Sequence, residues 1–208
     1  MRTKISTTLA AAAVSAFVVS GCTDNPTDSS MEGHSMAPSS TAQNSTPPAP
    51  ASVEFNDADV MFAKMMYPHH AQAVEMAAMA VGRTDNQEVL SLAAAIESAQ
   101  QPEMDQLTAW LAQWGQPAPS ADMGEMSGMD HSSQSGMMTQ QDMDALMSAS
   151  GPDFDRLWLT MMVAHHTGAI EMANVEIAQG SNPDAIGMAR TIAETQQREI
   201  DAMRQLLG

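Results

Sequence analysis

Two pairs of histidines are the residues of this sequence best suited to bind a metal ion. His69-His70 and His165-His166 each follow a Met-Met pair and precede Glu-Met-Ala, and the two copies lie 96 positions apart. The same spacing matches further residues without a gap: Asn86 with Asn182, Gln100 with Gln196, Glu103 with Glu199, and Leu111 with Leu207. Internal repetition of this kind predicts that the folded part consists of two copies of one helical hairpin.

Within each copy, a methionine lies four residues before each histidine. Residues four apart lie on the same side of a helix, so the thioether of Met65 and the imidazole of His69 can reach the same ion. Thioether and imidazole both suit Cu(I), and imidazole also accepts Cu(II). The candidate metal ligands on the helices are His69, His70, His165, His166, Met65, Met66, Met76, Met161, Met162 and Met172.

A histidine on an apolar helix face is more often a structural residue that hydrogen-bonds an oxygen atom. In that alternative, Glu75 and Glu171 bond the histidines of the other hairpin and lock the two hairpins together. Both interpretations can hold, because a metal-binding histidine needs a partner for its second nitrogen. Consecutive residues point about 100° apart on a helix. We therefore expect at most one histidine of each pair to point into the core, with the other at its margin.

A third group of soft ligands lies in a polar stretch, residues 115–138. Met123, Met126 and Met129 are three residues apart, and His131 follows. The intervening Gly, Ser and Asp residues disfavour a stable helix, and exposed thioethers are hard to explain by packing. The stretch therefore predicts a flexible Cu(I) site and resembles the methionine motifs of extracytoplasmic copper-handling proteins. The alternative is a methionine-rich linker that binds nothing.

Helices must position the histidine pairs. The apolar spacing predicts helices over 56–82, 86–113, 153–179 and 183–207, with a shorter helix over 139–149. Pro68 should kink the first helix, and Pro102 should bend or split the second. Candidate N-terminal caps are Asn56 or Asp57, Thr139 and Asn182. Two repeated hairpins predict an all-α four-helix bundle with approximate two-fold internal symmetry.

The N-terminal part is predicted to target and tether the protein. Residues 1–22 combine two basic residues with an apolar stretch too short to span a membrane, as in a signal peptide. The stretch ends in Val-Ser-Gly-Cys, which resembles a lipobox, so we expect Cys22 to carry the lipid of a membrane-anchored lipoprotein. The alternative is an ordinary secretory signal with a chance cysteine. Residues 23–54 are expected to be a disordered tether, which leaves 55–208 for one domain with repeats at 55–113 and 153–207.

Composition excludes several classes of function. The formal net charge is −17, which argues against nucleic acid as a partner, because phosphate binding needs Lys and Arg. The sequence holds no nucleophile triad, phosphate-binding loop, dinucleotide fingerprint or zinc-type cysteine cluster, so we expect no enzyme activity. Its 21 methionines exceed what a small core needs, and several lie in the polar stretches.

The two copies resemble the DUF305 family of secreted and periplasmic proteins, which has CopM-like copper-binding members. The residues that carry the resemblance are Asp59, Phe62, Met65-Met66, His69-His70 and Glu75-Met76-Ala77, together with Phe154-Asp155, Met161-Met162, His165-His166, residues 169–173, Gln196-Gln197 and Glu199-Ile200. The resemblance covers about residues 55–207 and implies a ferritin-like helical bundle. It also implies copper handling outside the cytoplasm. A di-iron site is not expected, because neither Glu75 nor Glu171 has a histidine three residues later.

The sequence thus predicts a lipid-anchored protein of the bacterial cell envelope or periplasm that buffers, sequesters or ferries copper. The expected ions are Cu(I), and also Cu(II) or Ag(I), with a copper-handling envelope protein as a further partner. The alternative is an envelope helical module that binds another protein and no metal.

Overall fold

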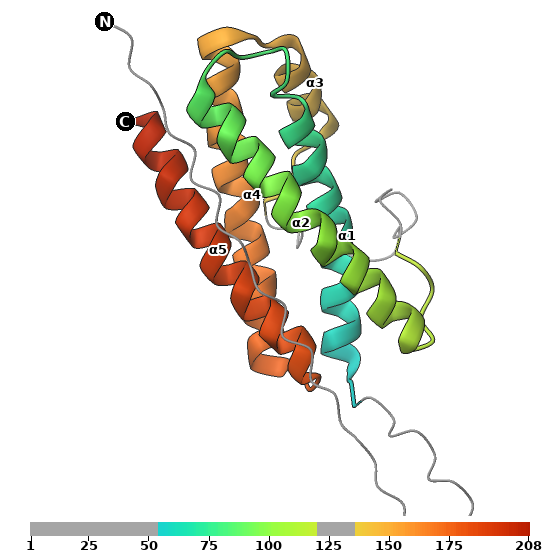
Figure 1. Cartoon of the computed structure of the whole chain (residues 1–208). Coiled ribbons are helices and arrows are strands. Elements are labelled where there is room, and N and C mark those ends of the chain that lie inside the picture. Colours follow the sequence, from blue (N-terminus) through green and yellow to red (C-terminus); the bar gives the residue numbers. More distant parts are fainter. Residues whose placement is uncertain (1–53, 120–135) are drawn as a thin grey trace, which may run out of the picture. The chain divides into compact units, whose positions relative to one another are not determined.

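The repeated segments form two helical hairpins in the computed structural model (Figure 1). The structure describes residues 54–119 and 136–208, which belong to one compact unit. The first hairpin consists of α1 (Asp57–Ala78) and α2 (Gln87–Gln113), and the second of α4 (Gly151–Gln179) and α5 (Pro183–Leu207). A short helix, α3 (Gln140–Ser148), precedes the second hairpin. Within the described residues every regular element is a helix.

Polar side chains fix where the helices begin. Asn56 and Asp59 form a capping box, in which the Asn56 side chain accepts from the amides of Ala58 and Asp59. Thr139 and Asp142 form a second capping box. Asn86 and Asn182, which match in the repeat, each accept two amides at the start of the second helix of their hairpin. These caps satisfy N–H groups that have no partner inside the helix. The predicted caps at Asn56, Thr139 and Asn182 are confirmed.

Helix boundaries and prolines differ from the prediction in three places. α1 ends at Ala78 instead of reaching 82, and the chain then turns through Gly82, whose φ is +78°. α4 begins at Gly151 instead of 153, so that Gly151 and Pro152 form its first turn, where proline loses no hydrogen bond. α2 runs unbroken through Pro102, so the predicted split does not occur.

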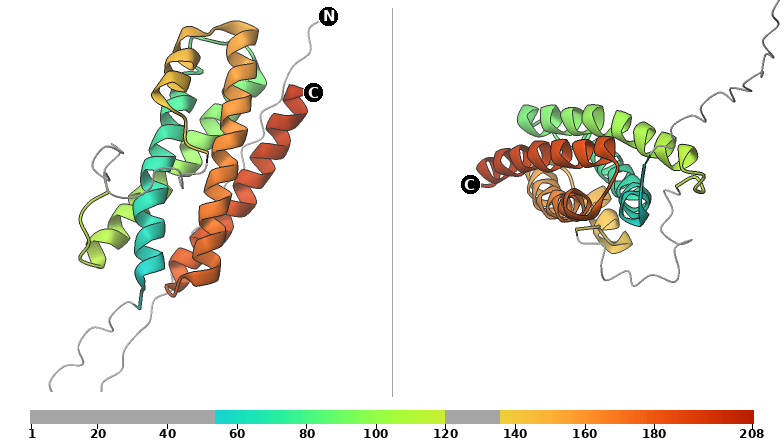
Figure 2. Two further views of the ribbon diagram at one scale, coloured as in Figure 1. Left: turned by 180° about the vertical axis from the view of Figure 1, so that it is seen from behind. Right: turned by 90° about the horizontal axis from the view of Figure 1, so that it is seen from below.

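The two hairpins pack through α1 and α4, which lie side by side at the centre of the bundle (Figure 2). α2 and α5 cover one side of this pair, and α3 lies on the other. The ends are joined crosswise, because Asp59 of α1 accepts from the amides of Ser181 and Asn182, while Asp155 of α4 accepts from Asn86. The prediction of an all-α, ferritin-like bundle made of two repeated hairpins is confirmed.

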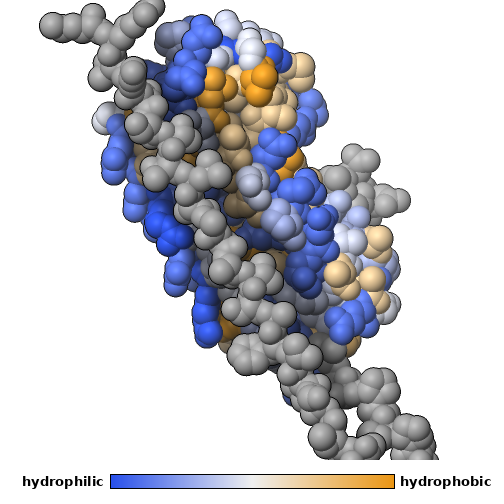
Figure 3. Space-filling view, in the orientation of Figure 1, coloured by the Kyte–Doolittle hydropathy of each residue, from blue (hydrophilic) through white to orange (hydrophobic). Residues whose placement is uncertain are grey.

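The apolar core is divided into two clusters. The cluster near α3 contains Phe154 and Trp158, whose indole N–H donates to the Met76 carbonyl at 2.8 Å. The other cluster contains Phe62, Leu107 and neighbouring residues. The outer surface carries mainly hydrophilic residues with small apolar patches on the face in Figure 3. Among the described residues no helix is long and apolar enough to cross a membrane.

Two buried carboxyl groups meet where α1 begins and α4 ends. Asp59 is fully buried and Glu176 is 1% exposed. Burial works against ionisation of Asp59, but hydrogen bonds from the backbone of Asn56, Asn182 and Ser181 and from the Glu176 side chain lower its pKa. Burial, the hydrogen bond to Asp59 and the charge of Asp59 raise the pKa of Glu176 to about 8. At neutral pH Glu176 is therefore a protonated donor to an ionised Asp59.

We expect this pair to make stability fall with rising pH. The pKa of Glu176 is 4.5 in its ordinary state and about 8 when folded, so between these values the folded protein holds a proton that the unfolded chain has lost. The stabilisation is complete below the lower value and is lost as pH rises through the window, by at most ~1.4 kcal/mol per pH unit. Asp59 titrates below its ordinary 3.8, outside this window.

The test is E176Q, which keeps an N–H donor to Asp59 and removes the titration. Chemical denaturation at pH 5, 6.5 and 8 should show that the free energy of unfolding of the wild type falls relative to that of E176Q as pH rises. The matched control is E171Q, an exposed change on the same helix, which should follow the wild type. Parallel pH profiles for the wild type and E176Q would contradict the assignment.

Candidate metal centre

His69 and His165 meet at the centre of the α1–α4 interface. They occupy the same position in the two repeats, and their ring centroids lie 3.7 Å apart with a 40° tilt between the planes. Their exposed fractions are 2% and 0%. The contact therefore joins the two hairpins through a pair of imidazoles with no access to bulk solvent.

His70 and His166 point toward the second helix of their own hairpin. Nε2 of His70 lies 2.7 Å from Oε2 of Glu103, and Nε2 of His166 lies 2.7 Å from Oε2 of Glu199. An ionised carboxylate can only accept, so in the neutral ring Nε2 carries the proton. The lone pair is then on Nδ1, which is buried in both rings and has no hydrogen bond within the described residues.

The expectation that one histidine of each pair lies at the core margin is wrong. All four are buried, with exposed fractions of 0–2%. α1 and α4 are each covered on two sides, by one another and by α2 or α5, so two adjacent side chains about 100° apart can both be enclosed.

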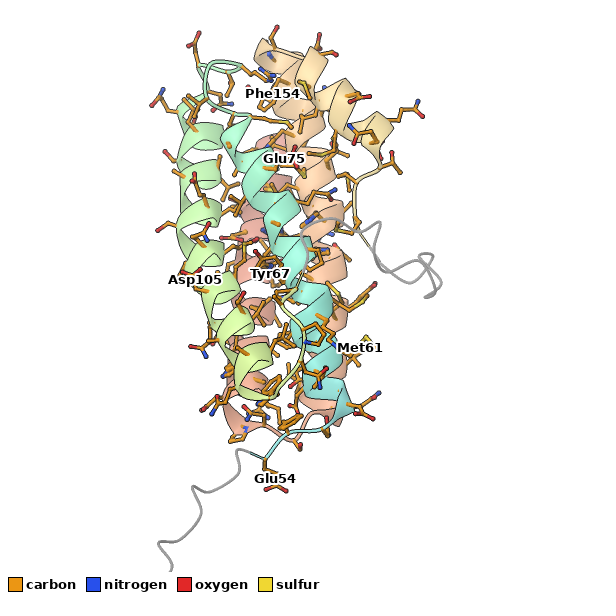
Figure 4. All side chains as sticks on the ribbon, turned by 90° about the vertical axis from the view of Figure 1, so that its right-hand side faces the viewer. Glu54, Met61, Tyr67, Glu75, Asp105 and Phe154 are labelled. Carbon is orange, nitrogen blue, oxygen red and sulfur yellow. The ribbon has the colours of Figure 1, made fainter. Side chains whose placement is uncertain are left out.

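The predicted bonding of Glu75 and Glu171 to the histidines is also wrong. Both glutamates are exposed, and Glu75 is labelled in Figure 4. Among the described residues, the carboxylates that bond the histidines are Glu103 and Glu199. Each comes from the same hairpin as its histidine, so these bonds do not lock the hairpins together. The repeat contained a signal for these two partners, because it matches Glu103 with Glu199.

The four histidines together with Glu103 and Glu199 form what we call the polar layer. Two glutamines, which were not predicted as site residues, extend this layer. Gln100 and Gln196, matched in the repeat, are 2% and 3% exposed. Each lies one helical turn before the glutamate of its helix and on the same face. Within the described residues, neither atom of the Gln100 amide has a hydrogen bond, nor does Oε1 of Gln196. A buried polar atom without a partner costs about 1–3 kcal/mol, so this layer is suited to receive a further ligand.

His165 is neutral at physiological pH. Burial lowers its pKa well below 6.5, and the charges of His69, His166 and His70 act in the same direction, opposed by the backbone of His69. Neither ring nitrogen of His165 makes a hydrogen bond of ordinary geometry with the described residues. A metal needs a neutral imidazole, and here binding would displace no proton.

The predicted methionines take two kinds of position. Met66, Met76, Met161 and Met162 are buried in the apolar clusters, and Met65 and Met172 are partly buried. Among the described residues, no group of three or more His, Cys, Asp or Glu could hold a metal ion. A metal bound at the two central histidines would therefore need thioether or amide donors to complete its ligands.

Several predicted features lie outside the described residues. They are the signal peptide with Cys22, the tether and the loop ligands Met123, Met126, Met129 and His131. Their predictions remain untested.

Comparison with known proteins identifies relatives. Residues 59–207 match the family described as Domain of unknown function (DUF305). A DUF305 protein of Streptomyces coelicolor is 34% identical, with a TM-score of 0.64 over 72% of this chain and 91% of that chain. A DUF305 fragment from Deinococcus radiodurans is 32% identical, with a TM-score of 0.64 over 74% and 97% of the two chains. No curated protein matches the chain.

CopM in the Cu(I)-bound form is 30% identical to this chain, with a TM-score of 0.58. The match covers 71% of this chain and 94% of CopM. CopM in Cu(II)-bound and Ag-bound forms matches similarly, with TM-scores of 0.59 and 0.57.

The geometry predicts that Glu103 supports the fold and Glu75 does not. E103A leaves Nε2 of the buried His70 without its partner, which should lower the free energy of unfolding by about 1–3 kcal/mol. E199A should have a similar effect, because it breaks the matching bond. The control E75A removes an exposed carboxylate from α1 and should stay within about 0.5 kcal/mol of the wild type. Equal losses for E75A and E103A in urea denaturation would refute the assigned partners.

Proposed function

The chain belongs to the DUF305 family, and we propose that it is an extracytoplasmic copper-binding protein that buffers, sequesters or ferries the ion. The observation that carries the proposal is the buried polar layer between the two apolar clusters. Its neutral His165, the Gln100 amide and Oε1 of Gln196 offer donor atoms that the described residues do not satisfy. The likeness to CopM, which is known in Cu(I)-, Cu(II)- and Ag-bound forms, supports the same ions as cargo here.

In this proposal, His69 and His165 supply the central imidazoles. Metal–nitrogen bonds of first-row ions are about 2 Å long. Two tilted rings with centroids 3.7 Å apart must therefore rotate so that a nitrogen of each faces the ion. Met65 and Met161 lie one helical turn before these histidines and provide the softer donors that favour Cu(I) and Ag(I).

The outer histidines act as a second, oriented pair. Glu103 and Glu199 hold the Nε2–H of His70 and His166, which leaves Nδ1 as the donor atom. Such a carboxylate fixes the ring and makes it a more basic ligand. These glutamates are themselves partly exposed, with side-chain fractions of 19% and 14%, so among the described residues the layer contacts solvent mainly through its carboxylates.

The loop ligands Met123, Met126, Met129 and His131 form a separate site in this proposal. They lie within nine residues of sequence, so they can surround an ion without the bundle. Three thioethers and one imidazole favour Cu(I) over Cu(II). The protein then combines one set of ligands that helix packing positions with another set that lies close together in the sequence.

We further propose that Cys22 carries a lipid that anchors the protein to a bacterial membrane, in the periplasm or on the cell envelope. The role is binding and transfer, without enzyme activity, and a copper-handling envelope protein is the expected exchange partner. The net charge of −17 supports a cation as ligand and argues against nucleic acid.

A second candidate is a structural or protein-binding module of the envelope that binds no metal. The bonds of His70 to Glu103 and of His166 to Glu199 favour it, because they give two of the four histidines a structural role. The two candidates differ in what copper does to stability. Only an ion that binds the native bundle raises its melting temperature.

The decisive experiment loads the full chain with Cu(I) under reducing conditions and measures copper content and melting temperature. The wild type should bind copper and melt at a higher temperature, because binding to packed ligands stabilises the native state. H69A/H165A should lose this thermal gain. A loop variant, with Met123, Met126 and Met129 changed to Leu and His131 to Ala, should keep the gain and bind less copper.

Circular dichroism without metal verifies that each variant remains folded. Should the wild type bind copper only through the loop, with no thermal gain, the helical site would be disproved. Should it bind none, the second candidate would be favoured.

A further inference from the structure

The segment that enters α3 is fixed to the turn of α4 that carries His165. We call residues 136–138 the strap. Gly136 has φ of +86°, a region that favours glycine. A Cβ built on it would lie 2.5 Å from the carbonyl oxygen of Ala164, 3.0 Å from that of His165 and 3.1 Å from the amide nitrogen of Gly168. No other residue fits here without moving the strap from the helix.

The other end of the strap is bonded to α1. The side-chain amide of Gln72 donates to the carbonyl oxygen of Met138 at 2.9 Å and accepts from its N–H at 2.7 Å. Gln72 is three residues after His69, so it lies on the next turn of the same helix side. Met138 also packs against the apolar cluster near α3.

The strap therefore spans from α4 to α1 at the level of the central histidine pair. α2 and α5 cover one side of the α1–α4 pair, and the strap leads into α3 on the other side (Figures 2 and 4). The residue that matches Gln72 in the repeat is Gly168, which has no side chain to bond a strap and whose backbone lies against Gly136.

We propose that Gln72 and Gly136 are positioning residues for the proposed metal site, because they hold the strap across the α1–α4 seam beside His69 and His165. An ion that leaves these histidines through the α1–α4 seam must then displace the strap. The strap sets the rate of metal exchange, whereas the histidines set the affinity. This inference rests on the proposed function.

The test measures release of Ag(I) or Cu(I) from the loaded full chain to an excess of a chromogenic chelator. Q72A removes two hydrogen bonds to the strap and should speed release on the order of tenfold or more, with unchanged stoichiometry. G136A should also speed release. The matched control Q197A removes an exposed glutamine that bonds only Asp201 on α5, and should release metal as the wild type does. The loop variant with Met123, Met126, Met129 and His131 replaced isolates release from the helices.

Amide hydrogen exchange of the metal-free proteins provides a readout that does not depend on metal. The amide of Met138 should exchange faster in Q72A, with the amides of α1 and α4 unchanged. Faster exchange at Met138 without faster metal release would overturn the role of the strap, as would unchanged exchange. A wild type that holds no ion at the helices would instead overturn the proposed function, so the two failures are distinguishable.

Discussion

Four imidazoles buried in one layer of the bundle are the constraint on which the rest of the structure depends. An enclosed imidazole loses its hydrogen bonds to water, so the fold must place a partner beside it or leave a costly unpaired group. Glu103 and Glu199 are that partner for the outer two rings, which requires α2 and α5 to align with α1 and α4 at one register. The inner two rings lie in contact at a tilt of 40°, which constrains how α1 and α4 cross. The polar layer also separates the two apolar clusters. The helices therefore cannot shift along one another without placing polar groups in an apolar cluster.

The repeat in the sequence was sufficient to predict the fold, since an apolar helix pattern that occurs twice has few ways to bury both faces. The caps at Asn56, Thr139 and Asn182 were also predictable, because a cap is a local interaction between neighbours in sequence. Which glutamate bonds each histidine was not. Glu75 lies five positions after His70 on the same helix, whereas Glu103 lies 33 positions beyond His70, and only the packing of α2 on α1 brings it within 2.7 Å. Helix periodicity predicts in which direction a side chain points, but it does not predict which helix packs over that side chain.

The two repeats differ at several positions around the polar layer, and these differences show which contacts belong to one repeat alone. Glu176 matches Ala80, so the carboxyl pair with Asp59 exists at one end of the bundle only. Gln72 matches Gly168, so the side-chain bond to the strap comes from the first repeat. Pro68 matches Ala164, yet both helices continue through this position. The histidines, glutamates and glutamines of the layer are kept in both copies, whereas the contacts around them are not. The layer is therefore the part whose geometry both hairpins must reproduce.

A protein that transfers a soft ion needs ligands that bind it tightly and ligands that release it. Histidines held in a packed interface lose little freedom on binding, which favours affinity, but the ion must pass packed side chains to reach them. Ligands within a short stretch of sequence must be ordered at the moment of binding, which weakens the complex and shortens the path to solvent. On the proposed function, this chain contains both kinds, and the strap lies where the stretch that carries Met123–His131 rejoins the bundle. Gly136 follows His131 by five positions in the sequence and lies against the turn of α4 that carries His165, so we infer that an ion can pass between the two sets without motion of the bundle as a whole.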